Sequence, residues 1–307
     1  MALTRSNLRL WYKMFTGQSI LHVNQGLGKC FSPTEIRGYY NDLTEKVTRL
    51  PHLLGTDVLP TLAIGGGQHV EFAVGIFQYG LGAYDLYLTT GGDVYKTKFQ
   101  QSLKWACDHQ EASGAWKTFQ HIYPDHPYGA MCQGEGVSLL LRGYISSHQQ
   151  EYIDRAHRAI DFMLTSVTEG GTTLYQEEDV VFREYPHRRA VLNGWIFAWF
   201  GLYDYVLVCQ DKGKYQKLLD ASCKTMLRHL PTLSRWYWSK YDFAGRVASP
   251  FYHNLHIALM QAMYQLTHHE EFKQYAEKWA RCSNNPFKKG IAISYKSIQK
   301  IFEKKVP

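Results

Sequence analysis

The segments Gly82-Ala-Tyr-Asp-Leu-Tyr87 and Gly201-Leu-Tyr-Asp-Tyr205 are near copies of one another, although they lie far apart in the chain. Each belongs to a long apolar stretch rich in small residues, which is followed by a short polar turn and then by an amphipathic stretch. The same design occurs four times, in residues 71–110, 130–166, 190–229 and 252–282. Repeated helical hairpins of similar length are typical of a solenoid or a closed toroid.

The two halves of each hairpin differ in polarity. The first helices are apolar almost all round, which predicts that they are buried, whereas the second helices have one polar face and belong on the outside. The first helices are expected at 71–88, 130–145, 190–209 and 252–266, and the second at 94–110, 151–166, 214–229 and 271–282. Four buried helices ringed by four amphipathic ones predict a mainly α fold, an (α/α)4 barrel.

The connections also follow a pattern. The turn within each hairpin is short, whereas the links into the first helices are long, at 51–70, 113–129, 167–189 and 230–251. Every long link enters an inner helix, so all four emerge at the same end of the barrel. Long loops at one end of a rigid scaffold usually carry function, and helix N-termini at that end favour an anionic ligand. The alternative is that these loops are only connectors.

The composition is that of an ordinary globular protein and excludes a disordered chain. The 307 residues are 45% apolar and 20% charged, and 34 basic residues against 27 acidic ones give a net charge of +7. This charge favours an anionic partner. Nucleic acid is one candidate, but the chain has no nucleic-acid signature, and an acidic sugar polymer fits the charge equally well. The 22 Tyr and 8 Trp suit either sugar contacts or an aromatic core.

Cysteine spacing and the N-terminus bear on localisation. None of the six cysteines forms a CxxC pair, which predicts separate thiols in a reducing compartment. Residues 1–10 lack the pattern of a signal peptide, so we expect a cytoplasmic protein. The apolar run 191–209 is interrupted by Asn193, Gly194, Gly201 and Asp204, which favours a buried helix over a membrane span.

The repeats divide the chain into three parts. We expect an N-terminal extension over 1–50 that packs on the barrel or on a partner subunit. Residues 51–290 form the barrel, and 291–307 form a basic, exposed, lysine-rich tail.

One long loop carries a candidate catalytic pair. Residues that precede a proline favour extended backbone, so Val180–Pro186 predicts a strand that places Glu184 beside Tyr185. Glu184 would serve as a general acid or base, and Tyr185 as a proton donor or sugar contact. Arg183 next to them could hold a carboxylate as a planar fork. A purely structural role explains any one of these residues equally well.

A second candidate group surrounds the start of the fourth inner helix. Tyr252 lies where the field of the helix N-terminus would stabilise a tyrosinate, and Tyr241 and Arg246 occupy the loop before it. His253 and His256 share one helical face, but no third ligand is evident, so we predict no metal site.

Taken together, residues 110–282 resemble the C-terminal catalytic domain of the D-glucuronyl C5-epimerases. The resemblance depends on short motifs that occur in the same order and at similar spacing. They are Tyr128-Gly-Ala-Met-Cys-Gln-Gly134, Glu184-Tyr-Pro186, Val191-Leu-Asn-Gly194 with Gly201-Leu-Tyr-Asp204, and Tyr252-His-Asn-Leu-His256. It implies an (α/α) barrel and an isomerase that converts glucuronate to iduronate within heparosan or heparan-type polysaccharide.

The resemblance also implies roles for individual residues. The catalytic residues would be Glu184, Tyr185 and Tyr252, with Tyr252 on the opposite face of the sugar from the other two. The substrate-binding residues would be Tyr128, Gln133, Asn193, Tyr241, Arg246, Arg183 and His253. The reaction would need no cofactor, its partner would be an acidic polysaccharide rather than nucleic acid, and the chain would form a homodimer. A tyrosine-based polysaccharide lyase and a non-catalytic polysaccharide-binding protein are the alternatives.

Overall fold

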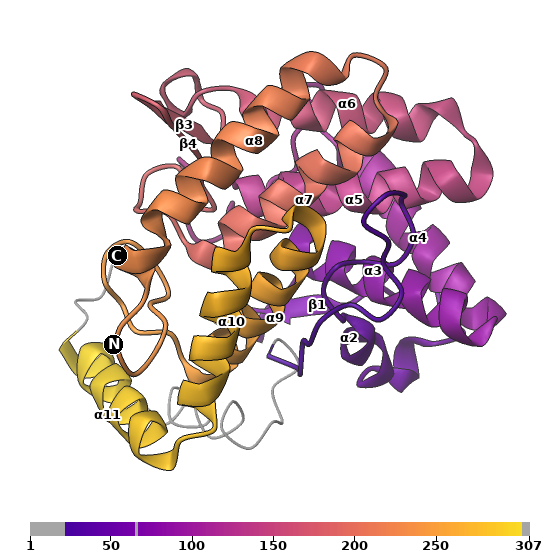
Figure 1. The fold of residues 1–307 in the computed structure, drawn as a ribbon. Coiled ribbons are helices and arrows are strands. Elements are labelled where there is room, and N and C mark those ends of the chain that lie inside the picture. The colour runs from indigo at the N-terminus through magenta and orange to yellow at the C-terminus, as the bar shows by residue number, and fades with distance from the viewer. Residues whose placement is uncertain (1–21, 65–66, 303–307) are drawn as a thin grey trace.

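The computed structural model describes residues 22–64 and 67–302 (Figure 1). The four repeated hairpins are α3 (Ala73–Thr90) with α4 (Asp93–His109), α5 (Ala130–Ser147) with α6 (Gln150–Leu164), α7 (Leu192–Val208) with α8 (Lys212–His229), and α9 (Pro250–Thr267) with α10 (Glu270–Ser283). Short α2 (Thr44–Thr48) precedes them and α11 (Pro286–Phe302) follows them. The hairpins match the predicted ones to within a few residues, and the predicted mainly helical (α/α) barrel is confirmed.

Burial separates inner helices from outer ones as predicted. Every residue of α5 from Ala130 to Gly143 is buried, whereas α6 buries one face made of Ala156, Ala159, Ile160, Met163 and Leu164. The inner helices α5 and α7 pack most closely, because Gly134 and Gly201 bring their backbones together. A Cβ atom on Gly201 would lie 2.4 Å from the backbone of Gly134. A side chain at either position would push the two helices apart.

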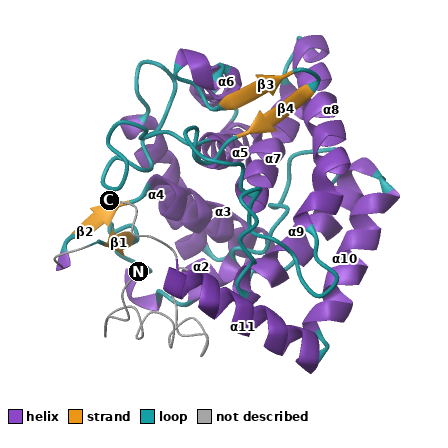
Figure 2. Ribbon diagram, turned by 90° about the vertical axis from the view of Figure 1, so that its left-hand side faces the viewer, coloured by secondary structure: helices purple, strands orange, loops and turns teal. Residues whose placement is uncertain are grey.

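Two β-hairpins lie in the long links of the described ranges (Figure 2). The strand predicted over Val180–Pro186 ends at Phe182, so Glu184 and Tyr185 follow it in the loop. Strands β1 (Thr61–Ala63) and β2 (His69–Glu71) pair antiparallel before α3, with Leu62 opposite Val70. Strands β3 (Thr173–Gln176) and β4 (Asp179–Phe182) pair antiparallel before α7, with Leu174 opposite Val181. The described parts of the links also contain 3-10 helices at Pro51–Leu53, Val167–Glu169 and Leu230–Leu233.

The described part of the N-terminal extension packs on the barrel. Tyr39 and Tyr40 contact the rings of Phe197 and Phe200 on α7, and α2 packs against α3. The ring of His22 contacts the rings of Phe251 and Tyr252 on α9. This segment therefore joins the two ends of the helix series α3, α5, α7, α9. Residues 1–21 of the extension lie outside the described residues.

The predicted C-terminal tail over 291–307 is helical as far as Phe302, and residues 303–307 lie outside the described residues. Residues 286–302 form the helix α11, and its Ala292 is buried against Tyr237, Trp238, Val247 and Ala248. Apolar residues between the lysines of this segment recur with helical spacing. The high lysine content obscures this pattern in the sequence. No helix in the described ranges is both long and apolar enough to cross a membrane, including the apolar α7.

Candidate active site

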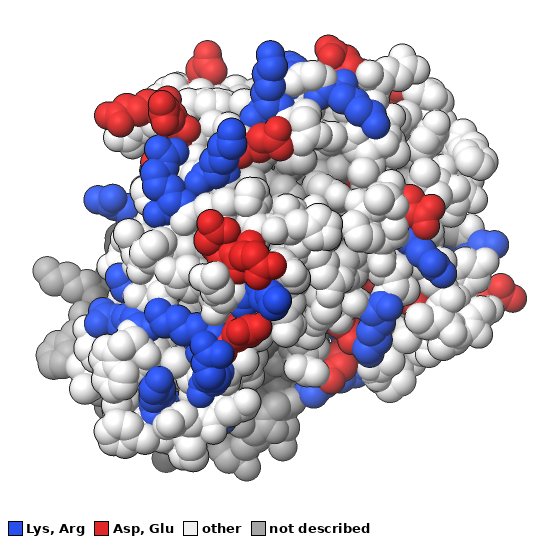
Figure 3. All heavy atoms as spheres, in the orientation of Figure 1, with Lys and Arg blue, Asp and Glu red and all other residues white. Residues whose placement is uncertain are grey.

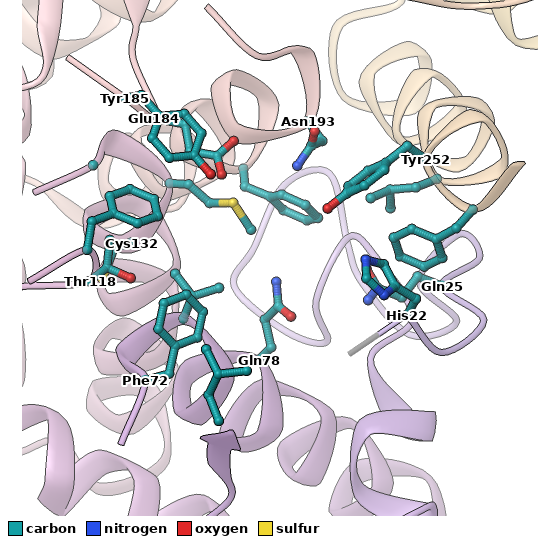
Figure 4. Close-up of a pocket in the computed structure, with 18 of the residues that line it drawn as sticks. His22, Gln25, Phe72, Gln78, Thr118, Cys132, Glu184, Tyr185, Asn193 and Tyr252 are labelled. Carbon is teal, nitrogen blue, oxygen red and sulfur yellow. The ribbon is translucent and has the colours of Figure 1, made fainter. Parts of the chain in front are cut away.

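A cavity of about 280 Å³ opens between the N-terminal halves of the four inner helices (Figure 4). All four long links contribute to its wall, through Leu62, Phe72, Thr118, Phe119, Glu184, Tyr185 and Tyr241, and Phe251 of α9 adds to it. The inner helices contribute Val74, Gln78, Met131, Cys132, Asn193, Phe197, Tyr252 and Leu255, and the N-terminal segment contributes His22, Gln25 and Lys46. The predicted functional end of the barrel is therefore where the cavity lies.

Glu184 lies at the meeting point of two inner-helix N-termini. The residue before it accepts a hydrogen bond from the first residue of α5, since Ala130 N donates to Arg183 O at 2.9 Å. Gly194 in the first turn of α7 leaves room for the carboxyl group, because a Cβ there would lie 2.4 Å from Glu184 Oε2. Glu184 is 8% exposed, and Oε2 has no hydrogen-bond partner within the described residues. Burial raises its pKa to about 7.

Tyr185 extends from the same loop beside Glu184, as predicted. Its ring stacks on Phe119 with centroids 4.5 Å apart, and Arg188 lies over it at 5.8 Å. Burial, followed by the charge of Glu184, raises the pKa of Tyr185 well above its usual value. Tyr185 is therefore neutral near pH 7 and can donate a hydrogen bond or a proton.

Tyr252 enters the cavity from the opposite side (Figure 4). Its hydroxyl points into the space that Glu184 and Tyr185 face, and its ring lies 4.7 Å from that of Tyr241. The prediction that the helix field would favour a tyrosinate is wrong for this structure. Burial and the charge of Glu184 raise the pKa of Tyr252 to about 12, although Tyr241 and Arg246 oppose the shift. Tyr252 thus carries its proton at neutral pH.

Two polar residues of the inner helices also face the cavity. Asn193, predicted from the sequence, is buried in the first turn of α7, and its Oδ1 has no hydrogen-bond partner within the described residues. Gln78 of α3 was not among the predicted site residues, and aligning Gly82–Asp85 with Gly201–Asp204 places it opposite Phe197 rather than opposite Asn193. The Gln78 amide donates to Glu135 Oε1 at 2.8 Å. Amides in such positions suit the hydroxyl groups of a sugar.

The cavity also contains a cation that sequence reasoning missed. Lys46 of α2 lines it, and the carboxyl group of Glu135 on α5 interacts with it electrostatically. Glu135 is fully buried, and burial raises its pKa to about 8. Burial lowers the pKa of Lys46, also to about 8. No motif marks a single lysine in a short helix, so only the folded chain identifies this pair.

Three predicted substrate-binding residues support the loops instead of lining the cavity. Gln133 exchanges hydrogen bonds with the backbone of Trp116, at 3.1 Å in each direction. Tyr128 donates to Glu111 at 2.6 Å. Arg183 donates to the carbonyl groups of Pro186 and Arg188, which fixes the loop that carries Glu184. Their side chains are occupied in holding the backbone around the site.

His253 is also placed away from the cavity, which corrects the prediction of a substrate contact. It is fully buried, stacks on Trp238 with centroids 3.6 Å apart, and contacts Ser239 Oγ and the Trp279 carbonyl through its two ring nitrogens. Burial lowers its pKa to about 3, so it is neutral. His256 contacts the same Ser239 hydroxyl. Within the described ranges, no three His, Cys, Asp or Glu side chains are grouped as metal ligands would be.

Arg246 lies behind the cavity wall rather than in it. Its guanidinium forms an ion pair with Asp242 and lies 5.3 Å from the centre of the Tyr241 ring. It acts on the site at a distance, since its charge lowers the pKa values of Glu184 and Tyr252 against the larger effect of burial. The structure thus brings Glu184, Tyr185, Tyr252, Tyr241 and Asn193 together around one cavity.

Comparison with known families gives a match to the D-glucuronyl C5-epimerase C-terminus over residues 109–281, which is more than half of the chain. The chain belongs to this family. The matched range includes Glu184, Tyr185, Tyr252 and Tyr241. It leaves out Lys46 and Gln78, as well as α11.

Two relatives show how far the likeness extends. A D-glucuronyl C5-epimerase of Caenorhabditis elegans is 22% identical over 220 residues, which are 62% of this chain and 36% of the relative. An uncharacterised protein of Methanocaldococcus jannaschii is 28% identical over 165 residues, which are 49% of this chain and 51% of the relative. This member of the C5-epimerase family therefore spans at most about half the length of these curated relatives.

The fold has a counterpart among solved structures. A cellobiose 2-epimerase from Spirochaeta thermophila matches with a TM-score of 0.51 at 11% identity, over 92% of this chain and 86% of that one. At this identity the likeness shows the barrel fold alone.

Proposed function

We propose that the chain epimerises D-glucuronate to L-iduronate at C5 within an acidic polysaccharide of the heparosan type. One observation carries the proposal: the Glu184 carboxyl group and the Tyr252 hydroxyl group face one cavity from opposite sides. Inversion at carbon by proton exchange needs two proton carriers, one on each face of the ring. Family membership supports the same chemistry.

The pKa values suggest which group acts first. Glu184, with a pKa of about 7, is substantially ionised near neutral pH and can accept the C5 proton, whereas Tyr252 still holds its own. Glu184 removes the proton, and the electron pair of the C–H bond moves into the adjacent carboxylate to form an enolate. Tyr252 then delivers its proton to C5 from the other face, which re-forms the carboxylate with inverted configuration. Solvent protons restore Tyr252, and Glu184 releases the proton that it took.

The enolate carries more negative charge than the bound uronate, so stabilising it is a large part of the catalysis. Lys46 is the cation that lines the cavity among the described residues, and we assign it to the substrate carboxylate. This replaces the assignment of Arg246 or Arg183, whose guanidinium groups are held by Asp242 and by backbone carbonyls. Asn193, Gln78 and Tyr241 would contact the sugar hydroxyl groups. Tyr185 would donate a hydrogen bond beside Glu184.

Proton NMR of the protein with N-sulfated and unsulfated heparosan in deuterated water tests the proposal. We expect loss of the glucuronate C5 proton signal together with new iduronate signals. Cleavage of the polymer that leaves an unsaturated uronate at the new chain end would instead identify a polysaccharide lyase. Such an enzyme begins with the same proton abstraction. No exchange on either polymer would overturn the proposal.

Tyr252→Phe tests the second proton carrier. We expect the variant to lose at least about a hundredfold in iduronate formation, as is typical when one acid–base group is removed. Tyr264→Phe, on the same helix but outside the cavity, is the matched control. Full activity of Tyr252→Phe would remove Tyr252 from the mechanism. The family resemblance also implies a homodimer, which sedimentation analysis of the purified chain checks.

A further inference from the structure

The helix α11 is fixed beside the cavity wall, although it lies outside the family match. Its Gln299 accepts a hydrogen bond from Val247 N at 2.9 Å, and Ala292 packs in a small apolar cluster with Trp238 and Val247. Tyr241 and Tyr252 pack against the same cluster. One edge of α11 is therefore continuous with the wall of the cavity.

Cationic and aromatic side chains alternate along the seam between α11 and the loop that precedes α9. Lys296 lies 5.9 Å from the centre of the Tyr241 ring, Arg235 lies 5.0 Å from that of Tyr295, and Lys288 lies 5.9 Å from that of Trp236. We call Arg235, Trp236, Lys288, Lys289, Tyr295 and Lys296 the α11 track. It begins at Tyr241 in the cavity wall and ends at Trp236.

The α11 track is positively charged and partly exposed: Trp236, Lys289 and Tyr295 are exposed, whereas Arg235, Lys288 and Lys296 are half-buried. Lys288 Nζ also donates to Cys282 Sγ at 3.8 Å. Trp236 is 63% exposed and Tyr295 is 38% exposed. The sequence of α11 contains four lysines and no Asp or Glu, whereas the neighbouring α10 contains three glutamates. Lys and Arg side chains gather over the α11 region at the lower left of Figure 3, beside acidic groups over α10. A flat ring with a polar edge, flanked by cations, matches a sugar ring that carries a carboxylate or sulfate.

We propose that the α11 track binds the anionic polysaccharide strand where it leaves the cavity. The nine residues from Lys288 to Lys296 span ~12 Å along the helix, which is longer than a single sugar ring. A strand with one uronate in the cavity therefore extends over Tyr241 and along the lysines. This inference rests on the proposed function for the uronate in the cavity. It adds a binding surface that recognises the charge of the polymer rather than its reacting carbon.

Polymer binding by matched variants tests the proposal. The double variant Lys288→Ala/Lys289→Ala and the single variant Trp236→Ala alter the track, while Lys217→Ala/Lys224→Ala removes two exposed lysines of α8 as a control with the same charge change. Affinity for long heparosan and for a short heparosan fragment is measured at low and high salt. We expect the track double variant to bind the polymer about tenfold more weakly at low salt, with a smaller loss at high salt.

The control is expected to keep wild-type affinity to within about twofold, because surface charges far from the strand are screened. The single variant Lys289→Ala changes only an exposed side chain, so it is not expected to disturb the fold. Thermal unfolding of each variant checks that the fold is retained. Equal polymer affinity and salt dependence in the wild type and the track variants would overturn the proposal. C5 exchange by the wild type is measured separately. If the wild type bound polymer through the α11 track but catalysed no C5 exchange, the proposed function would be refuted and the binding proposal would stand.

Discussion

Asp204 and Glu184, at opposite ends of the inner helices, are buried carboxyl groups with different surroundings. At the end away from the cavity, both oxygens of Asp204 on α7 accept hydrogen bonds, from Arg142 at 2.7 Å and from Tyr40 at 2.6 Å. At the cavity end, Glu184 Oε2 and Glu135 Oε2 are buried and have no partner within the described residues. Burial raises the pKa of both glutamates. Asp204 is fully paired within the fold, whereas the unpaired oxygens of Glu184 and Glu135 suit the proton exchange that we propose.

The largest expected effect is on catalysis at the cavity end. Glu184→Gln keeps the shape of the side chain but cannot accept a proton, so we expect C5 exchange to fall by about a thousandfold, equivalent to ~4 kcal/mol. The measurement is the rate of deuterium incorporation at C5. Glu178→Gln, an exposed glutamate in the turn between β3 and β4, is the control. Exchange within a few-fold of wild type would show that Glu184 is structural after all.

Removing a charge at the other end should affect stability instead. Arg142→Met leaves Asp204 buried without its cation, and breaking a buried pair in this way costs about 3 kcal/mol or more in the free energy of unfolding. Urea unfolding measures the loss. The double variant Arg142→Met/Asp204→Leu should recover much of it, because neither charge then remains buried. If the single variant were as stable as wild type, the pair would not be what secures this end.

The pH dependence of stability distinguishes the two ends further. The pKa of Glu184 is raised from 4.5 to about 7, so the folded state holds this proton more tightly than the unfolded state. Its stabilising contribution is therefore complete below pH ~4.5 and declines as the pH rises to ~7, by about 3 kcal/mol in total. Urea unfolding of wild type and Glu184→Gln across this range should show the difference. A constant difference between them would contradict the raised pKa.

The smallest expected effects come from two glycines of α7. A Cβ on Gly194 would lie 2.4 Å from Oε2 and 2.7 Å from Cβ of Glu184, so Gly194→Ala should displace the Glu184 side chain and lower exchange by about tenfold. Gly201 faces the backbone of Gly134, which cannot shift as easily. Gly201→Ala should therefore lower stability by about 1–3 kcal/mol. Exchange rates and urea unfolding of both variants measure this contrast, and equal effects on activity would contradict it.

The helical hairpins could be predicted from the sequence because helical periodicity and turn residues are local features of the chain. The predicted residues Glu184, Tyr185, Tyr252, Tyr241 and Asn193 all line the cavity where long loops meet inner helices, and their roles stay predictions. Sequence reasoning misassigned Gln133 and His253, which are polar and near helix N-termini but face away from the cavity. The direction that a side chain takes from a fully buried helix depends on its neighbours in space, and the periodicity of such a helix does not reveal it.

Lys46 and the raised pKa of Tyr252 could not be predicted for a related reason. Both depend on burial by segments far away in the chain, since α2 reaches the cavity only because the N-terminal extension crosses the barrel. Gln78 likewise depends on the folded chain, because the repeat alignment places it opposite Phe197 rather than opposite Asn193.

The N-terminal segment from His22 to Thr48 has a consequence for how this chain is divided in the laboratory. Three residues of the cavity wall come from it, and four more come from residues 62–78, all before the first residue that the family shares. A fragment cut at the family boundary would retain Glu184 and Tyr252 but lack the wall that faces them. The range that the family shares is therefore shorter than the range that completes the cavity wall, and an expression clone should cover the longer one.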